Sequence, residues 1–324
     1  MYLMVASGMR GGVCTISQRY AKANNPYLGA DYDPNSPSKY IIYLDANNLY
    51  GWAMSQYLPS GHFYWVEQAG WEQIDWQATS PTGPFAYIVE CDLEYPAELH
   101  DLHNDYPLAA ERVQIQVEML SDTQVEISRH YARARVGKNV KLVTNLMKKT
   151  KYVVHSANLK FYLDHGLRLT KIHRVISFTQ SPWMASYIEM NTAMRAAAQN
   201  EMERDFHKLM NNAVYGKTCE NQRKRNDIRL LTDHQKIAKL VSKPHCLSVG
   251  AFDRNLVGVE LRKVKQVLTK PSYVGFAVLE LSKLHMLRCV PLPLFCTLSF
   301  SFSLFDHPLI IKILIMWFED FTTT

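Results

Sequence analysis

The feature that most constrains this chain is a helical pattern that ends in Lys208-Leu-Met-Asn-Asn-Ala-Val-Tyr-Gly-Lys217. At about 100° per residue, the polar residues of this segment lie within about 60° of arc and the apolar residues lie opposite. The polar set is Arg204, Lys208, Asn211 and Tyr215, and the apolar set is Ala198, Met202, Phe206, Leu209 and Met210. We predict that the apolar face packs and that the polar face contacts a ligand. The alternative is an ordinary solvated face, because exposed helices commonly carry Lys and Arg.

The ends of this helix can be placed from its capping residues. Asn191 or Thr192 is suited to the N-cap, and the alanines at 196–198 favour helix. Gly216 lies where a helix commonly ends. The sequence therefore predicts a helix near residues 192–217.

A second informative segment is Lys39-Tyr-Ile-Ile-Tyr-Leu-Asp45-Ala-Asn-Asn-Leu-Tyr50, in which an apolar, β-prone run ends in a carboxylate. A strand that delivers Asp45 at its end can hold a metal ligand on a rigid element. The alternative is that Asp45 caps a following helix that begins near Leu49.

Together these two segments resemble the polymerase module of family B DNA polymerases, in particular the protein-primed branch of viruses, linear plasmids and self-synthesising transposons. The first segment matches Asp-x-x-Ser-Leu-Tyr-Pro, with Asn48 for Ser and Gly51 for Pro. The second matches Lys-x-x-x-Asn-Ser-x-Tyr-Gly, with Ala213 for Ser. The resemblance extends from about Gly11 to Met286.

The resemblance implies an α+β fold, with an antiparallel palm sheet carrying Asp45 and a helical fingers element. We expect an N-terminal linker and template-contact segment at 1–38, a polymerase module at 39–286 and a divergent tail at 287–324. We also expect the chain to lack the thumb and the proofreading exonuclease.

By resemblance, the site transfers a dNTP to a primer with Mg²⁺ or Mn²⁺ as cofactor. Asp45 would be the catalytic metal ligand, with the carbonyl of Ala46 beside it. Lys208 and Arg204, one helical turn apart, would bind the triphosphate. The partners implied are primer-template DNA, dNTPs and a terminal protein that supplies the priming hydroxyl.

The resemblance also assigns the pocket for the nascent base pair. Tyr50 would stack under the deoxyribose and exclude a 2′-hydroxyl, while Asn212 and Tyr215 would line the pocket. These residues favour dNTP over NTP as the substrate.

Charge is strongly segregated along the chain. Residues 1–128 carry 5 Lys or Arg against 16 acids, a net charge of −11, whereas residues 129–174 carry 12 against one, a net charge of +11. Such a basic run suits tracking of a nucleic-acid backbone, and a solvated face is the alternative. We predict DNA contacts in this run at Lys148, Lys149 and Lys151. By resemblance, further contacts are expected in the glycine-containing segment Arg10-Gly11-Gly12.

Asp92-Leu-Glu94 imitates the metal motif of an exonuclease, because two carboxylates at i and i+2 of a strand share a face. Its position after Asp45 does not fit the resembled family, in which the exonuclease comes first. A metal-dependent nuclease using Asp92 and Glu94 is therefore an alternative function, as is a DNA- and nucleotide-binding remnant without catalysis.

The tail departs from the family. Residues 287–324 contain no Tyr-x-Asp-Thr-Asp-Ser motif, which would supply the second metal-binding carboxylate, and they hold only 5 charged positions. Pro291, Pro293 and Pro308 interrupt the apolar runs, so we expect no membrane-spanning segment. We hypothesise that this tail was translated from sequence unrelated to the polymerase.

The remaining composition fits an intracellular protein, with the nucleus or a viral or transposon replication site as possible locations. The apolar run at the N-terminus is too short for a secretory signal. The six cysteines show neither paired spacing nor a zinc-type cluster.

Overall fold

The computed structural model describes residues 1–13, 20–43, 46–130, 140–289 and 310–314. The chain divides into two compact units, the first made of residues 1–215 and 273–324 and the second of residues 216–272. Asp45 lies outside the described residues.

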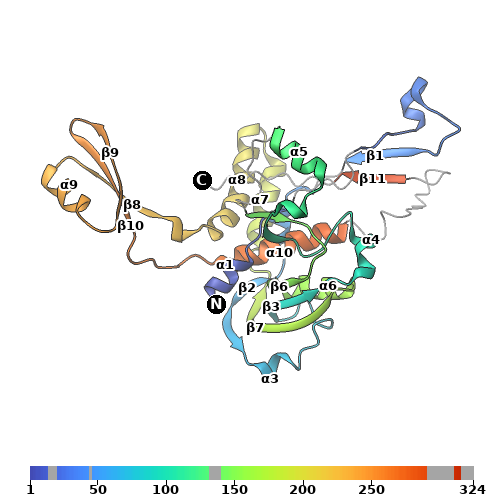
Figure 1. Ribbon diagram of the computed structural model, residues 1–324, viewed down its shortest axis with the longest axis horizontal. Helices are drawn as coiled ribbons and strands as arrows, with labels where there is room; N and C mark the ends of the chain where they lie inside the picture. Colours follow the sequence, from blue (N-terminus) through green and yellow to red (C-terminus); the bar gives the residue numbers. More distant parts are fainter. Residues whose placement is uncertain (14–19, 44–45, 131–139, 290–309, 315–324) are drawn as a thin grey trace. The chain divides into compact units, whose positions relative to one another are not determined.

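The first unit is built on a four-stranded sheet with the order β2-β7-β3-β6, in which every neighbouring pair is antiparallel (Figure 1). The strands are β2 (Leu58–Val66), β3 (Phe85–Glu94), β6 (Lys149–His155) and β7 (Arg168–Ser181). The strands are rich in β-branched and aromatic residues, such as those of the run Ile88-Val89 in β3, which suit a pleated, buried surface. This sheet, with the helices around it, confirms the predicted α+β class.

Two helices at opposite ends of the sequence pack on this sheet. They are α1 (Tyr2–Gly8) and α10 (Ser272–Cys289). Val5 of α1, Phe276 of α10, and Ile88 and Phe178 of the sheet belong to one hydrophobic cluster and are almost fully buried. At Gly8 an added Cβ would collide with the ring of Phe276 and the side chain of Val153, so α1 approaches α10 and β6 through its glycine. Burial of this cluster fixes both chain segments against the sheet.

The first unit also contains several further elements. They are η1 (Pro26–Asp31), α2 (Leu49–Met54), α3 (Gln68–Trp71), η2 (Ala97–Leu99), α4 (His100–His103), β4 (Glu111–Gln114), η3 (Val117–Met119), α5 (Asp122–His130), β5 (Val140–Val143) and α6 (Ser156–Asp164). Strands β4 and β5 form an antiparallel pair. No helix among the described residues is long and apolar enough to cross a membrane.

The strand before Asp45 forms as predicted, but its pairing differs from the prediction. Strand β1 (Lys39–Tyr43) pairs in parallel with β11 (Ile310–Leu314), and these two strands form a separate sheet. The expectation that the antiparallel sheet carries this strand was therefore wrong for the described residues. An apolar strand with a free edge accepts any β-prone partner, and the sequence did not specify which one.

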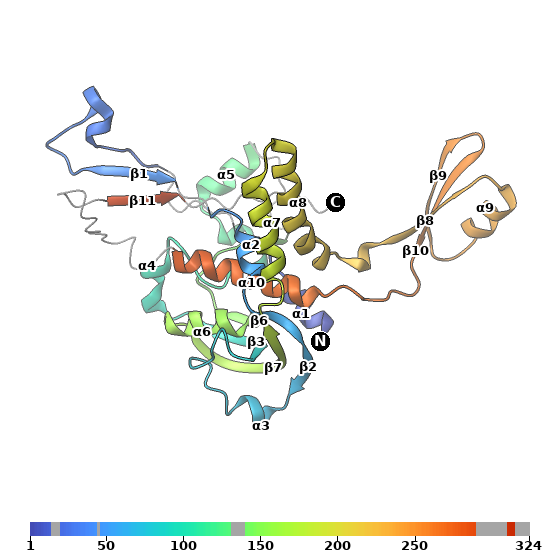
Figure 2. The same ribbon diagram turned by 180° about the vertical axis from the view of Figure 1, so that it is seen from behind.

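The predicted single helix near 192–217 is two helices, α7 (Ala185–Ala197) and α8 (Glu201–Thr218), which lie side by side in Figures 1 and 2. The prediction was wrong about its start. Ala198 is extended, and Asn200 begins α8 by accepting a hydrogen bond from the Glu203 N–H at 2.9 Å. Thr192 lies inside α7, where its hydroxyl donates to the Ile188 carbonyl at 2.8 Å.

The second unit is a small antiparallel sheet with one helix. Strands β8 (Asn226–Leu231), β10 (Leu256–Arg262) and β9 (Cys246–Asp253) lie in that order, following the short η4 (Gln222–Lys224). Helix α9 (His234–Val241) is capped by the Asp233 carboxylate and contributes Leu240 to a core with Val259 and Leu261. The sequence analysis did not separate this unit from its surroundings.

His155 provides a test of the packing between β6 and α6. Its Nδ1 accepts from the Ala157 N–H at 3.2 Å and so caps α6, while burial lowers its pKa to about 4 and Glu280 opposes that shift. Since the unfolded state takes up a proton near pH 6.5 and the folded state does not, stability is lost as the pH falls from about 6.5 to about 4.

We expect His155→Asn, which keeps a capping oxygen but cannot titrate, to remove this pH dependence. At pH 4.5, relative to pH 7, the wild-type free energy of unfolding should fall by about 2 kcal/mol more than that of the variant. Urea unfolding at the two pH values measures this difference. Equal losses in the two proteins would contradict the assignment.

Candidate functional site

The two sequence motifs meet at a groove formed by α2, α7 and α8. Asn47 and Asn48, which follow Asp45, line it from one side, and Asn211 of α8 lines it from another. The other lining residues are Trp52, Ser55, Ile188, Glu189, Thr192, Ala193, Arg195 and Ala196. The groove is open, with a volume of about 650 Å³. Segments about 160 residues apart in sequence thus form one concave surface.

The motif tyrosines also meet. The rings of Tyr50 and Tyr215 stack with centroids 4.3 Å apart and planes 20° apart, and both residues are buried. Offset stacking of two aromatic rings is favourable beyond the area it buries. The stack therefore fixes α8 against α2 at the edge of the region for which we predicted nucleotide binding.

The two departures from the first motif are physically linked. Asn48 adopts a left-handed conformation (φ 53°), and its side chain lies over Gly51, where an added Cβ would collide with the amide. A larger residue at position 51 would displace the Asn48 side chain from this place. The two positions at which this segment departs from the resembled motif therefore constrain each other sterically.

The exposure of α8 differs from the predicted division into faces. Met202, Phe206 and Leu209 are 84%, 54% and 61% exposed, whereas Asn211 and Tyr215 are buried. The prediction that the apolar face packs was wrong. Helical periodicity separates two faces, but it does not tell which face has a neighbour.

The predicted triphosphate-binding cations remain accessible. Arg204 and Lys208 are exposed, and neither side chain has a hydrogen bond or ion pair within the described part of the chain. Asn212 is partly buried, and Ala46 is partly buried before α2. Asn211, which the sequence placed on the polar face, has a buried Oδ1 that no donor reaches among the described residues. That oxygen is a hydrogen-bond acceptor available in the wall of the groove.

Arg195 and Glu189 of α7 are groove residues that the sequence reasoning missed. Arg195 is partly buried and Glu189 is exposed. Because they belong to a different helix from Lys208, the periodicity of one helix could not relate them to the motif. The Tyr187 hydroxyl, which donates to the Met210 carbonyl at 3.0 Å, holds the two helices together.

The described residues do not form a complete metal site. No three His, Cys, Asp or Glu side chains among them lie close enough to hold a metal ion. Asp45, the predicted metal ligand, lies outside the described ranges.

The charge segregation is partly neutralised by ion pairs within the chain, one of them buried and two at the surface. Three basic side chains of the run 129–174 pair with acids of the run 1–128 at 2.7 or 2.8 Å. These pairs are Lys149 with Glu111, Arg168 with Glu98, and Arg174 with Glu90. The pairing of acidic with basic strands therefore accounts for part of an asymmetry that the sequence analysis attributed to nucleic acid.

The predicted DNA-contacting residues fall into two groups. Gly11, Gly12, Lys148 and Lys151 are exposed. Arg10 and Lys149 are 6% and 0% exposed, and their charges are used within the fold. Burial lowers the pKa of Lys149, and the carboxylate of Glu111 opposes this shift.

The side chain of Asp92 has a structural role, because it accepts hydrogen bonds from two neighbouring strands. Its Oδ1 accepts from the Lys151 N–H at 2.7 Å and from His173 Nε2 at 2.8 Å, so this oxygen orders two neighbouring strands. Burial raises the pKa of Asp92, but these two partners outweigh it and hold the pKa below its usual value. Glu94 is exposed at the end of β3, and no group of three His, Cys, Asp or Glu side chains in the described part of the chain could hold a metal ion here.

Comparison with known proteins identifies the family to which this chain belongs. Residues 10–243 match the family "DNA polymerase type B, organellar and viral". The chain is therefore a member of this family, as its sequence motifs indicated. No match was found among the curated proteins.

Solved structures of phi29 DNA polymerase are similar to the chain. The complex with primer-template DNA and incoming nucleotide substrates shares 12% identity at a TM-score of 0.44, covering 87% of this chain and 38% of that one. The orthorhombic crystal form shares 12% identity at a TM-score of 0.41, covering 73% and 33%. The binary complex with primer-template DNA shares 13% identity at 0.40, covering 73% and 32%. The chain spans about a third of the length of these proteins.

Asp92→Asn tests the structural assignment of this carboxylate. We expect a loss of about 1–2 kcal/mol in unfolding free energy, because two hydrogen bonds to a charged acceptor are weakened. Chemical denaturation measures the loss, with Glu94→Gln as the matched control that should have little effect. Metal-dependent strand degradation that vanishes in Asp92→Asn without loss of stability would support the nuclease instead.

Proposed function

We propose that the chain is the palm and fingers portion of a DNA-directed DNA polymerase and binds a dNTP at the groove between α2, α7 and α8. The observation that best supports this proposal is that Asn47 and Asn48, Arg195 and Asn211 line one groove, although three separate segments supply them. Family membership supports the same activity.

In this proposal, side chains around the groove bind different parts of the nucleotide. Arg195 of the groove, together with Arg204 and Lys208 on the exposed face of α8, supplies positive charge for the triphosphate. The amides of Asn48 and Asn211 offer hydrogen bonds to the base or sugar, and the Tyr50 side chain limits space beside the deoxyribose. The fit of these groups favours a dNTP over an uncharged ligand.

A divalent metal ion is part of the proposal. Asp45 would hold Mg²⁺ or Mn²⁺, which supplies charge neutralisation to the reacting phosphates when bound. The described residues do not provide a full set of ligands, so no step of the mechanism is assigned to the metal. The primer end, its template and a terminal priming protein are further proposed partners.

A second candidate function is binding of DNA and nucleotide without turnover. It is favoured by the groove and the exposed cations of α8, which can bind nucleotide phosphates without a metal ion. Primer extension by the purified chain with Mg²⁺ and labelled dNTPs separates the two. Incorporation that Asp45→Ala abolishes would support polymerisation, whereas salt-sensitive DNA binding with no incorporation would support the remnant.

The groove assignment predicts the behaviour of two cations. Arg195→Ala and Lys208→Ala should each weaken dNTP binding about 10- to 100-fold, because each removes a charge-assisted contact to phosphate. Equilibrium dialysis with labelled dNTP measures this effect without requiring turnover. Lys236→Ala, which removes an exposed cation of α9, is the control and should bind dNTP normally. Unchanged affinity both in the variant of Arg195, which lines the groove, and in the variant of Lys208, which lies on the exposed face of α8, would refute the site.

The DNA-contacting surface is tested by neighbouring lysines that differ in burial. Lys148→Ala and Lys151→Ala should each reduce the slope of log affinity against log salt by about one, because each removes one phosphate contact. Lys149→Ala should instead lower the unfolding free energy by about 3 kcal/mol, since it breaks a buried ion pair. Fluorescence anisotropy at several salt concentrations and urea unfolding measure the two effects. A salt slope unchanged in both exposed variants would exclude this surface.

A further inference from the structure

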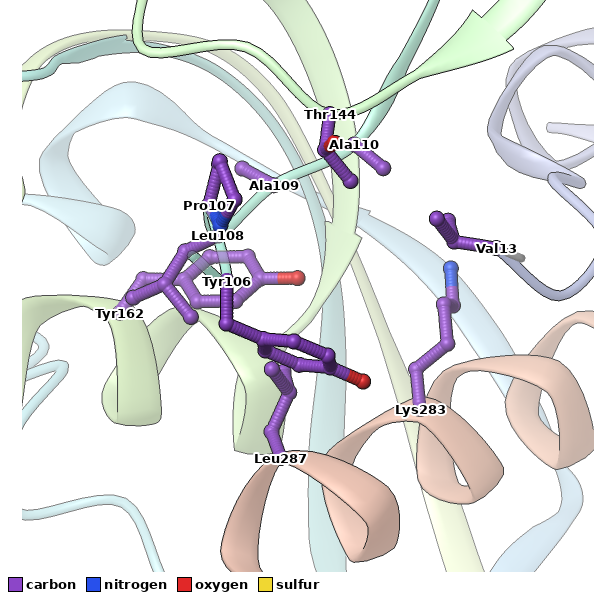
Figure 3. Close-up of a pocket in the computed structure, with 10 residues that line it drawn as sticks. All are labelled: Val13, Tyr106, Pro107, Leu108, Ala109, Ala110, Thr144, Tyr162, Lys283 and Leu287. Atoms are coloured by element: carbon purple, nitrogen blue, oxygen red, sulfur yellow. The ribbon is translucent and has the colours of Figure 1, made fainter. Parts of the chain in front are cut away.

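A small pocket of the first unit and a strand edge of the second unit differ in what they can bind. The pocket lies beside Tyr106, Tyr162 and Lys283 (Figure 3), and its volume of about 40 Å³ has room for water but not for a nucleotide. The strand edge belongs to β9, which lies at one end of the sheet order β8-β10-β9. Within the described part of the chain, β9 pairs only with β10, so one row of its backbone N–H and C=O groups is available to another strand.

Strand β9 is exposed and uncharged over most of its length. Residues 247–252 contain no charged side chain and no proline, and all of them are exposed. The larger apolar side chains among them, those of Leu247, Val249 and Phe252, are 43%, 48% and 69% exposed. An edge strand of this composition is prone to pair with a further strand, because nothing in it opposes the loss of water on pairing.

The opposite edge of the same sheet is protected by charge. Strand β8 carries Asp227 and Arg229, whose side chains form an ion pair at 2.9 Å. Charged side chains on an edge strand disfavour pairing with a second sheet, because pairing would remove water from them. This small sheet therefore has one protected edge and one edge that is suited to a partner.

The ends of β9 indicate that a second copy of β9 is a fitting partner. Lys243 and His245 lie in the turn before the strand, and Asp253 ends it. When two copies run antiparallel, the acidic end of each strand lies beside the basic turn of the other. In the register that places Val249 opposite Val249, Asp253 falls beside His245 and Lys243 of the second copy. Residues 248–251, at the centre of this register, pair regularly with β10, whereas the register shifts on either side of them.

We propose that two copies of the chain associate through β9, paired antiparallel with Val249 at the two-fold axis, so that the sheets of the two second units become one continuous sheet. Each copy contributes the same strand, as a two-fold interface requires. Because a single short strand forms the contact, the association is weak and reversible. It uses no residue of the groove and does not depend on the proposed polymerase activity.

Sedimentation equilibrium of the full chain tests the association. The protein is treated with nuclease first, because residues 216–272 carry 13 Lys or Arg against 5 acids and bound nucleic acid would bridge two copies. The unaltered protein should dimerise reversibly. Val249→Lys should raise the dissociation constant of the dimer at least tenfold, because it places a charge at the centre of the paired edge.

Ile228→Lys is the matched control, because it replaces an apolar side chain of the same sheet that is 66% exposed but lies on the protected strand β8. It should dimerise as the unaltered protein does. Equal weakening by Ile228→Lys and Val249→Lys would show general association of apolar surface and overturn the pairing through β9.

Val249→Cys tests the register. Residues directly opposite each other in an antiparallel pair have Cα atoms about 4.5–5.5 Å apart, a separation that a disulfide spans. Under mild oxidation Val249→Cys should give a disulfide-linked dimer. Leu247→Cys, which lies opposite Ala251 in this register, should not exceed the background of the unaltered protein with its six native cysteines.

The remaining outcomes are equally decisive. A protein that stays monomeric at every concentration, or a dimer that Val249→Lys leaves intact, would overturn the proposal. Cross-linking through Leu247→Cys in place of Val249→Cys would overturn the symmetric register. None of these results affects the proposed nucleotide site, which equilibrium dialysis tests separately.

Discussion

The first unit depends on the buried carboxylate of Glu280. Through this one side chain α10 contacts Arg10 and the His155 N–H, while the backbone carbonyl of Glu280 accepts from Asn158 of α6 at 2.9 Å. An unpaired ionised carboxylate could not be buried at this depth, so its partners must fold together with it. Because one of these partners lies near the N-terminus and another follows β6, the group joins segments that are distant in sequence.

This arrangement explains why the hydrophobic cluster alone does not define the structure. Val5, Ile88 and Phe276 would pack in several similar ways, since apolar contacts are non-directional. Hydrogen bonds to Glu280 have defined directions and therefore select one position of α10 along the sheet. Packing supplies most of the stabilisation, whereas the charged group selects the geometry.

Local features of the fold could be predicted from the sequence, and features that depend on a neighbour could not. Strand β1 was predicted from its β-branched run, and the meeting of Tyr50 and Tyr215 agrees with motif residues that the sequence placed at one site. The burial of Lys149 could not be foreseen, because it requires Glu111, an acid on a strand that is not adjacent in sequence. The exposure of Phe206 has the same origin, since periodicity does not reveal which face has a partner.

The segregated charge of the chain overstates the basic surface available to DNA, because part of that charge is neutralised by ion pairs within the chain. A net charge of −11 in residues 1–128 and +11 in residues 129–174 suggests a single large DNA-binding surface, yet ion pairs between the two runs neutralise part of that charge. The cations that we propose to contact a phosphate backbone are exposed ones, such as Lys148 and Lys151, whereas Lys149 between them is buried in an ion pair. Since the electrostatic part of DNA affinity scales with the number of phosphates neutralised, a few well-positioned charges must be supplemented by directional groups. On the proposed DNA-binding surface, the exposed backbone of Gly11 and Gly12 supplies such groups.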